Sequence, residues 1–384
     1  MSFTNETGTY LFEDLSKLED YTVRPMDNSN FLEGISTFDV VLITKHILDK
    51  QSLDSPYKLI AADINKSGSI STYDIVLLRR VILGVADDFP NNQSWRYVAA
   101  EYEFPDKTNP FKEEFPEHIN YKQLLGSEFN KDFIAVKIGD VNDSANPSFT
   151  QSEARTTASF LLHLEDIEMK AGQTYRLPVL AKDLQEILGY QMTLQFDQSL
   201  VAFQEVIPNQ PNRMSLANFG LNRTKKGFLT TSWEQSPSLS VEDDALLFTL
   251  VIKAKKNTQL SKTLVVNSSI TIAEAYSKES TIMDVGLHFT ATTSKSNLAL
   301  FQNQPNPFTQ QTIIGFQLPS ATTATLSIYN INGQLVKTFS GYYQAGYNEL
   351  LIDLKDLTTN SGVLYYHLQT PNTKRLTKKM IRLK

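Results

Sequence analysis

The sequence STFDVVLITKHIL at residues 36–48 returns 35 residues later as STYDIVLLRRVIL at residues 71–83. In both copies a Ser-x-x-Asp pair opens a segment whose apolar residues recur at helical spacing. Each copy is one loop and helix, and the two copies pack together because neither buries its apolar face alone. The repeat therefore predicts a small helical unit between about Gly34 and Gly84.

The residues ahead of the second helix have the spacing of a twelve-residue calcium loop. With Asp63 as position 1, side-chain oxygens fall at positions 1, 3, 5, 9 and 12, a backbone carbonyl falls at position 7, and Gly68 permits the turn. A capping box of Ser71 and Asp74 is the alternative, but it leaves Asp63 and Gly68 unexplained. We therefore predict Ca²⁺ bound by Asp63, Asn65, Ser67, Ser69, Ser71 and Asp74.

A weaker loop precedes the first helix, with predicted ligands Asn28, Asn30, Gly34, Ser36 and Asp39. Position 1 lacks a carboxylate, for which Asp27 could substitute, and position 5 lacks an oxygen because it is Leu32. Ligand charge sets calcium affinity, so sites with two carboxylates or fewer suit the calcium-rich exterior of a cell. Calcium here would be structural, its binding free energy adding to the free energy of folding.

Composition and charge exclude several classes of function. The chain has 36 Lys and Arg against 42 Asp and Glu, so no overall positive field attracts nucleic acid. Cysteine is absent, which excludes disulfides, thiolate metal sites and cysteine nucleophiles. No apolar run approaches the ~18 residues that a transmembrane span needs. The five histidines are scattered, and no nucleophile, phosphate-loop or dinucleotide motif is present, so we predict no catalytic residue and no enzyme.

The length of 384 residues predicts two or three domains, and outside the repeat the spacing of apolar residues changes along the chain. Residues 87–132 have Pro and aromatic residues without a clean period, which predicts an irregular excursion pinned by its aromatic side chains. Residues 151–292 contain short alternating runs such as YRLPVLA and FLTTSW, typical of an antiparallel sandwich. The polar stretch TATTSKSN at residues 290–297 is typical of a linker. Residues 293–384 are predicted to form a third, strand-rich domain. The predicted fold class is multidomain, α plus all-β.

Residues 46–84 resemble a dockerin module, in the variant found in secreted proteins of Bacteroidetes, and IGDVN at residues 138–142 matches the segment that typically follows. The resemblance implies a dockerin-like calcium module with an irregular extension over residues 27–150. Asp140 and Asn142 could form a further ligand fragment or only a turn, and the turn is slightly favoured. Residues 1–26 resemble the last strands of a carboxypeptidase-regulatory-like or Cna-B-like sandwich, which predicts a fragment truncated on its N-terminal side.

Residues 169–197, together with LLFTLVIKA at residues 246–254, are similar in pattern to a cohesin-like β-sandwich. In cellulosomes a cohesin is the receptor for a dockerin, so the resemblance raises an intramolecular or intermolecular dockerin-cohesin contact. Two modules in series without contact are the alternative, and both stay open. Trp233 with Tyr190 and Tyr276 could form a sugar-stacking surface, but an aromatic residue in a sandwich strand is more often part of the core.

From about Leu298 the chain resembles the C-terminal sorting domain of type IX secretion cargo. The motif residues, in family order, are Pro305, Asn306, Pro307, Phe308, Gly333, Gly346, Asn348, Gly362, Lys378, Lys379 and Met380. The resemblance implies a small Ig-like β-sandwich and export across the outer membrane by the type IX secretion machinery. It also implies removal by a surface sortase near residues 290–297 and attachment at the cell surface through lipopolysaccharide.

The preferred interpretation is the non-catalytic, calcium-stabilised stalk and sorting region of a secreted surface protein. One alternative is an accessory region of a secreted hydrolase whose catalytic domain lies upstream. Another is a carbohydrate-binding module on the middle sandwich.

Overall fold

The repeat copies form two helices of equal length, α1 (Thr37–Ile47) and α3 (Thr72–Ile82), with the shorter α2 (Pro56–Ala62) between them. Both α1 and α3 begin with a capping box, which satisfies backbone N–H groups that a helix start leaves unpaired. Their inward side chains, among them Ile43 and Leu78, are buried in one core. The predicted helical unit is confirmed.

These features belong to a computed structural model of the chain. It describes residues 2–5, 8–145, 159–182, 184–209, 214–235, 245–291, 298–303, 306–344, 346–353, 355, 357, 362–371 and 375–383.

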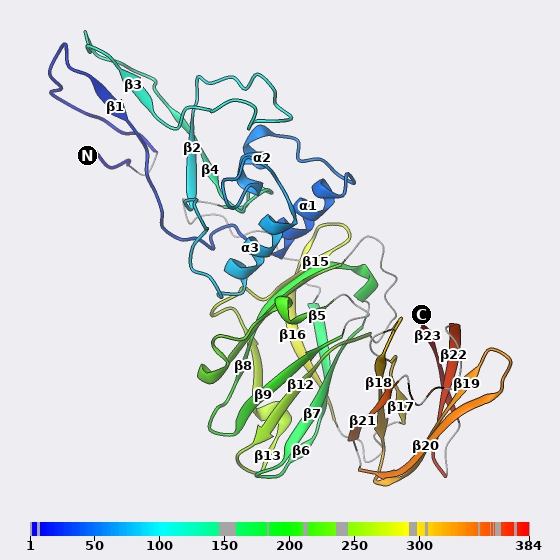
Figure 1. Ribbon diagram of the computed structural model, residues 1–384. Helices are drawn as coiled ribbons and strands as arrows, with labels where there is room; N and C mark the ends of the chain where they lie inside the picture. Colours follow the sequence, from blue (N-terminus) through cyan, green and yellow to red (C-terminus); the bar gives the residue numbers. More distant parts are fainter. Residues whose placement is uncertain are drawn as a thin grey trace.

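Two short ribbons extend the helical unit, and we name residues 27–145 the helical module. β2 (Trp95–Ala99) pairs with β4 (Phe133–Lys137), and β1 (Tyr21–Val23) pairs with β3 (Ile119–Tyr121), both antiparallel. Figure 1 shows β1 and β3 in an arm that projects away from the helices. The pairing attaches the first residues of the chain to the extension, and the upstream sandwich stays a prediction. Between β2 and β3 the chain is irregular and is anchored to the core by Tyr102, Phe104, Phe111 and Phe115, as predicted.

The middle domain is a β-sandwich whose strands follow the order β10-β11-β8-β15-β16-β5-β7-β12-β9, with β14 also on β8 and β13 pairing with β6. Its strands are β5 (Ser159–Asp166), β6 (Glu168–Met169), β7 (Thr174–Ala181), β8 (Ile187–Phe196), β9 (Val201–Pro208), β10 (Phe219–Gly220), β11 (Phe228–Glu234), β12 (Ala245–Ala254), β13 (Thr258–Gln259), β14 (Leu264–Asn267), β15 (Glu274–Ser277) and β16 (Ile282–Ala291). Among the described residues of this domain, short 3₁₀ helices join the strands: η1 (Leu184–Glu186), η3 (Leu216–Asn218), η4 (Thr224–Lys226) and η5 (Leu260–Lys262).

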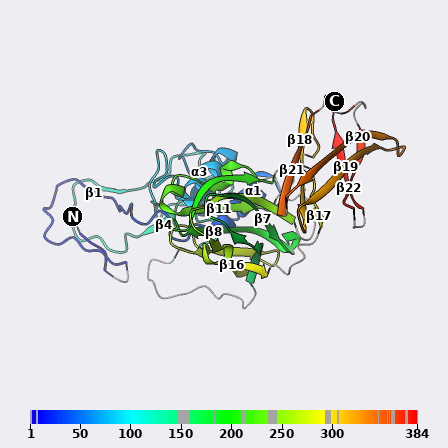
Figure 2. The ribbon, with the colours of Figure 1, turned by 90° about the horizontal axis from the view of Figure 1, so that it is seen from below.

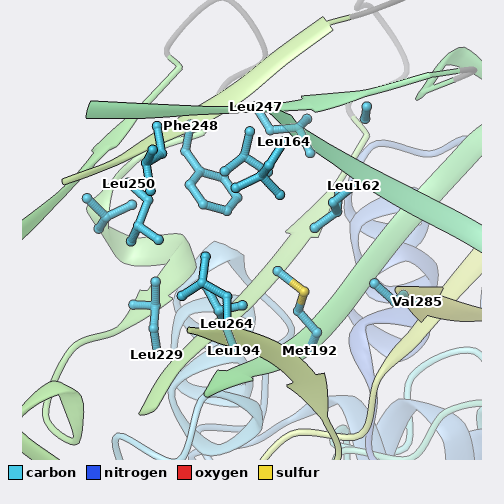
Figure 3. Close-up of a cluster of buried hydrophobic side chains, with 14 of the residues drawn as sticks. Leu162, Leu164, Met192, Leu194, Leu229, Leu247, Phe248, Leu250, Leu264 and Val285 are labelled. Atoms are coloured by element: carbon cyan, nitrogen blue, oxygen red, sulfur yellow. The ribbon is translucent and has the colours of Figure 1, made fainter. Parts of the chain in front are cut away.

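Alternate side chains of these strands meet between the two layers, as Leu164, Met192 and Phe248 do in Figure 3. One pairing corrects the expected antiparallel sandwich, because β5 and β16 run parallel along their length. Parallel neighbours need a long connection, and here the whole domain provides it.

The described strands of the last domain form two sheets. One contains β17 (Ala299–Leu300), β18 (Gln311–Leu318) and β21 (Gly346–Asp353), and the other contains β19 (Thr322–Asn330), β20 (Leu335–Tyr343), β22 (Gly362–Gln369) and β23 (Leu376–Arg382). Figure 2 shows the β1 arm, the middle sandwich and this domain in a row. An ion pair of 3.1 Å between Arg176 and Glu349 connects the last two domains. Among the described residues, the helices are too short or too polar to cross a bilayer.

Candidate functional site

The second predicted calcium loop closes on two buried carboxylates, Asp63 and Asp74. Asp63 accepts the backbone N–H groups of Ser67 and Gly68, each at 2.8 Å. Asp74 accepts the backbone N–H groups of Ile64 at 3.0 Å and Ser71 at 2.8 Å. The structure therefore brings the first and last positions of this loop together, with Asp63 and Asp74 at most 1% exposed.

The donor atoms of this loop fit a hard cation. The side-chain oxygen of Asn65, at position 3, is inaccessible to solvent and has no hydrogen-bond partner. Leaving such an atom unpaired costs free energy, which a bound cation would recover. No group of three His, Cys, Asp or Glu side chains gathers in the described part of the chain. The loop instead combines two carboxylates with neutral oxygens, a mixture that suits Ca²⁺.

The first predicted loop is assembled differently from the prediction. Gly34, Ser36 and Asp39 lie at the start of α1, whereas the side chains of Asn28 and Asn30 bond to other residues. The side-chain oxygen of Asn28 accepts the backbone N–H of Ser94 at 2.9 Å, and the amide of Asn30 donates to Glu33 at 3.2 Å. The Asn28 side chain is therefore tied to the entrance of β2, while Asn30 as a ligand stays a prediction.

Residues 140–145 lie where the first half of that loop was expected. Asp140 accepts the backbone N–H groups of Ser144 at 3.1 Å and Ala145 at 2.7 Å, and Asp39 accepts that of Val141 at 2.9 Å. Burial raises the pKa of Asp39 well above its usual range, and the nearby Asp140 carboxylate adds to the effect. The sequence interpretation favoured a turn here. The spacing Asp-x-Asn-x-Ser, shared by residues 140–144 and residues 63–67, was the available signal.

The start of α1 is inserted into the face of the middle sandwich formed by β8 and β11. The backbone N–H and the hydroxyl of Thr37 donate to the Gln191 side-chain oxygen at 2.7 and 2.9 Å. The Thr37 hydroxyl also lies 2.7 Å from that of Ser232. All three residues are buried, so this polar cluster is closed to water. Gly189 lies beside it, where an added Cβ would come within 3.0 Å of the Thr37 methyl group.

The end of α3 meets the same face. Backbone carbonyls of residues 82–84 accept hydrogen bonds from Thr271 at 2.6 Å, Thr230 at 2.7 Å and Asn222 at 3.0 Å. A helix leaves its last carbonyl groups without partners, and the sandwich supplies them here. Arg79 adds an ion pair of 2.5 Å with Glu234.

Aromatic stacking completes this contact. The ring of Phe38 stacks on Tyr276 with a centroid distance of 5.3 Å. Burial raises the pKa of Tyr276 well above its usual range, with Glu274 adding to the effect, and its hydroxyl donates to Glu274 at 2.9 Å. Tyr190 and Trp233 belong to the sandwich core, which confirms the core interpretation. A sugar-stacking surface on these three residues is therefore wrong.

The second repeat copy does not make this contact in the same way. Thr72 and Tyr73 correspond to Thr37 and Phe38, yet both are exposed on the surface of α3. The two copies therefore provide matched pairs of residues with the same chemistry and different surroundings.

The sorting-motif residues tie the last strand to its domain. The Asn306 side chain accepts the backbone N–H of Ile381 at 2.7 Å, and the buried Phe308 bonds to the backbone on both sides of Arg382. Gly333, Gly346 and Gly362 have positive φ. Asn348 donates to backbone carbonyls near Gly346, Lys378 and Lys379 lie on β23, and Met380 is buried. Pro305 lies outside the described residues.

Comparison with known families assigns the last two domains. Residues 160–285 match the cohesin domain, and residues 304–383 match the secretion system C-terminal sorting domain. The chain therefore contains a cohesin domain and a type IX sorting domain, both from non-catalytic families, and the sorting domain indicates a secreted protein. No curated protein matches the chain.

Three solved structures illustrate the structural similarities. The seventh ScaB type I cohesin from Pseudobacteroides cellulosolvens is 15% identical over 35% of this chain and 89% of its own, with a TM-score of 0.27. A type II cohesin domain from the cellulosome of Acetivibrio cellulolyticus is 9% identical over 35% and 92%, with a TM-score of 0.27. The Coh-OlpC-Doc435 complex, a type I cohesin-dockerin complex from Clostridium thermocellum, is 13% identical over 36% and 94%, with a TM-score of 0.28.

Proposed function

We propose that this chain is the non-catalytic, calcium-braced stalk and sorting region of a secreted surface protein, in which a dockerin-like module docks on the cohesin domain of the same chain. The observation that carries the proposal is the buried cluster of Thr37, Gln191 and Ser232. In it, a helix start from one module meets side chains from two strands of the other.

The polarity of this cluster supports docking of the two modules in preference to an arrangement in series without contact. Gln191 and Ser232 lie on a sandwich face and are completed by Thr37 of the helical module. A buried polar group left without its partner costs about 1 to 3 kcal/mol. The cohesin face is therefore complementary to a partner that offers a hydroxyl and a free backbone N–H at a helix start.

The covalent connection favours the intramolecular form. Residues 146–158 join the helical module to the cohesin domain. A short connection converts docking into an intramolecular step, with an effective concentration on the order of millimolar. An external dockerin or cohesin at a lower concentration would have to displace the module already attached.

Calcium would brace the helical module at Asp63, Asn65, Ser67, Ser69, Ser71 and Asp74. When bound, Ca²⁺ supplies the positive charge that two buried carboxylates require. Asp63 and Asp74 form no ion pair with Lys or Arg within the described ranges. Since Asp74 also lies in the first turn of α3, the loop would connect calcium binding to the direction of that helix.

The sorting domain would direct the stalk to the cell surface. Export by the type IX machinery, cleavage by a surface sortase near residues 290–297 and attachment to the outer membrane are the steps that we assign to it. The contacts of Asn306 and Phe308 with the last strand support a role for the motif in holding that strand in place.

Docking can be trapped because the chain has no cysteine. Replacing Thr37→Cys and Ser232→Cys puts two thiols where hydroxyl groups lie 2.7 Å apart, and the S–S bond is about 2.05 Å long. We expect an intramolecular disulfide whose yield is independent of protein concentration, measured by non-reducing electrophoresis and mass spectrometry. The pair Thr72→Cys and Ser232→Cys is the matched control and should remain reduced. Cross-linked dimers alone, or equal yields from both pairs, would contradict intramolecular docking through α1.

Sorting is tested at Phe308. Truncating this buried ring by Phe308→Ala should cost about 3 to 5 kcal/mol of domain stability and loosen β23. We expect the variant to accumulate in the periplasm of a type IX-competent host, measured by fractionation and immunoblotting. Ile331→Ala, which removes an exposed side chain of the same domain, should reach the surface normally. Surface levels of the Phe308 variant equal to those of this control would reject the proposed role.

A further inference from the structure

We propose that the start of α1 and residues 140–145 form a second calcium site, split between two distant segments of the chain. Its ligands are the side chains of Asp140, Asn142, Ser144, Ser36 and Asp39 and the carbonyl oxygen of Gly34. The inference extends the calcium chemistry of the proposed function and does not require docking.

The hydrogen bonds of the two loops correspond one to one. Asp140 accepts N–H groups four and five residues later, as Asp63 does. Asp39 accepts the N–H of Val141 at 2.9 Å, as Asp74 accepts that of Ile64 at 3.0 Å.

The middle of the loop corresponds as well. The Ser144 hydroxyl donates to the Gly34 carbonyl at 2.9 Å, and the Ser67 hydroxyl donates to the Ser69 carbonyl at 3.1 Å. The fourth residues, Asp143 and Lys66, have φ values of 59° and 56°. Residues 140–145 therefore supply the first half of the loop and residues 34–39 the second half.

An unpartnered atom indicates a ligand at this place. The side-chain oxygen of Asn142 is inaccessible to solvent and accepts no hydrogen bond, and the same holds for Asn65 at the equivalent position of the continuous loop. The two sites thus share an orphaned oxygen at position 3. A cation would give each oxygen the partner that it lacks.

The charge of the split loop also requires compensation. Asp39 is fully buried and Asp140 is 5% exposed. Neither forms an ion pair with Lys or Arg in the part of the chain that the structure describes. Two buried carboxylates facing one another are costly unless a positive charge lies between them, and a divalent cation would supply it.

Glycine at position 34 permits the two segments to meet. Its φ is +68°, and a Cβ at this position would lie 2.5 Å from the backbone nitrogen of Ala145. The close approach brings the end of the module against its first helix. Calcium at the split site would therefore fasten residues 140–145 to the start of α1, beside Thr37 of the cohesin contact.

Calcium stoichiometry tests the split site. We expect the full chain, stripped with chelator and titrated with Ca²⁺ in a calorimeter, to bind two ions with dissociation constants between about 10⁻⁵ and 10⁻³ M. Asp140→Asn and Asp63→Asn should each bind one, and both changes together none. Asn28→Ala, at the residue that the structure places outside the site, should still bind two.

The outcomes separate the split site from the other proposals. A wild-type chain that binds one ion, lost in Asp63→Asn and kept in Asp140→Asn, overturns the split site and leaves the continuous loop standing. A chain that binds none overturns both. Docking is measured separately by the disulfide trap.

A second measurement tests the split site without changing Asp140, and so does not depend on whether the Asp140 variants fold. In a chain carrying only Asp63→Asn, Ca²⁺ should slow amide hydrogen exchange in peptides covering residues 138–145. Peptides from the β1 arm should not change. Unchanged exchange at residues 138–145 in millimolar calcium overturns the split site.

Discussion

Arg79→Glu is expected to separate the helical module from the cohesin domain. Arg79 pairs with Glu234 at 2.5 Å, and the two side chains are only 11% and 19% exposed. The substitution would place two negative charges together in a region of low polarity. Breaking such a pair at an interface typically costs about 2 to 5 kcal/mol. We expect the yield of the Thr37→Cys, Ser232→Cys disulfide to fall sharply and amide exchange at the start of α1 to accelerate.

Two further variants decide the interpretation of that result. Arg80→Glu changes the same charge on the same helix at an exposed position and should leave docking intact. Adding Glu234→Arg to Arg79→Glu restores opposite charges and should recover part of the disulfide yield. If Arg79→Glu behaves as Arg80→Glu does, the ion pair makes no contribution to docking.

Removal of calcium is expected to lower the melting temperature of the helical module by 10 °C or more, on the order of 4 to 8 °C for each kcal/mol lost in a small domain. A ligand present at 100 times its dissociation constant stabilises the folded state by about 2.7 kcal/mol, so two sites can contribute roughly twice that amount. The sorting domain contains no predicted ligand, and its transition should stay in place. Differential scanning calorimetry with and without chelator measures both transitions in one experiment.

Single-site variants assign the calcium effect to each loop. Asp63→Ala should remove the stabilisation that calcium provides at the continuous loop. The chelator-induced shift in melting temperature should then fall by about half, following the same linkage. The residual shift should disappear when Asp140→Ala is added. Equal melting curves with calcium and with chelator for the wild-type chain would reject calcium bracing altogether.

The features predicted correctly from sequence are those carried by short contiguous segments. The helices of residues 36–48 and residues 71–83 follow from apolar spacing and a capping box. The segment from Asp63 to Asp74 folds back on itself, as its spacing predicts, because its residues are contiguous in the chain; calcium binding there stays a prediction. The sorting motifs and the alternating runs of the cohesin domain were recognised for the same reason.

The errors share a physical cause. Asn28 satisfies the loop spacing, but spacing does not reveal that its side-chain oxygen accepts a hydrogen bond from the backbone of Ser94. Strand alternation has the same period in either direction, so it could not reveal the parallel pair of β5 and β16. The partner of Asn28 and the relative direction of β5 and β16 are both set by residues distant in the sequence.

The sequence by itself determined the repeat and its two helices, the strand-rich domains and the sorting motifs, because each depends on residues close together in the chain. Only the tertiary structure decided that Asp140 faces Asp39, and that Thr37 meets Gln191 and Ser232 while Thr72 stays exposed. Those contacts join residues far apart in sequence. They depend on the packing of whole domains, which no local pattern encodes.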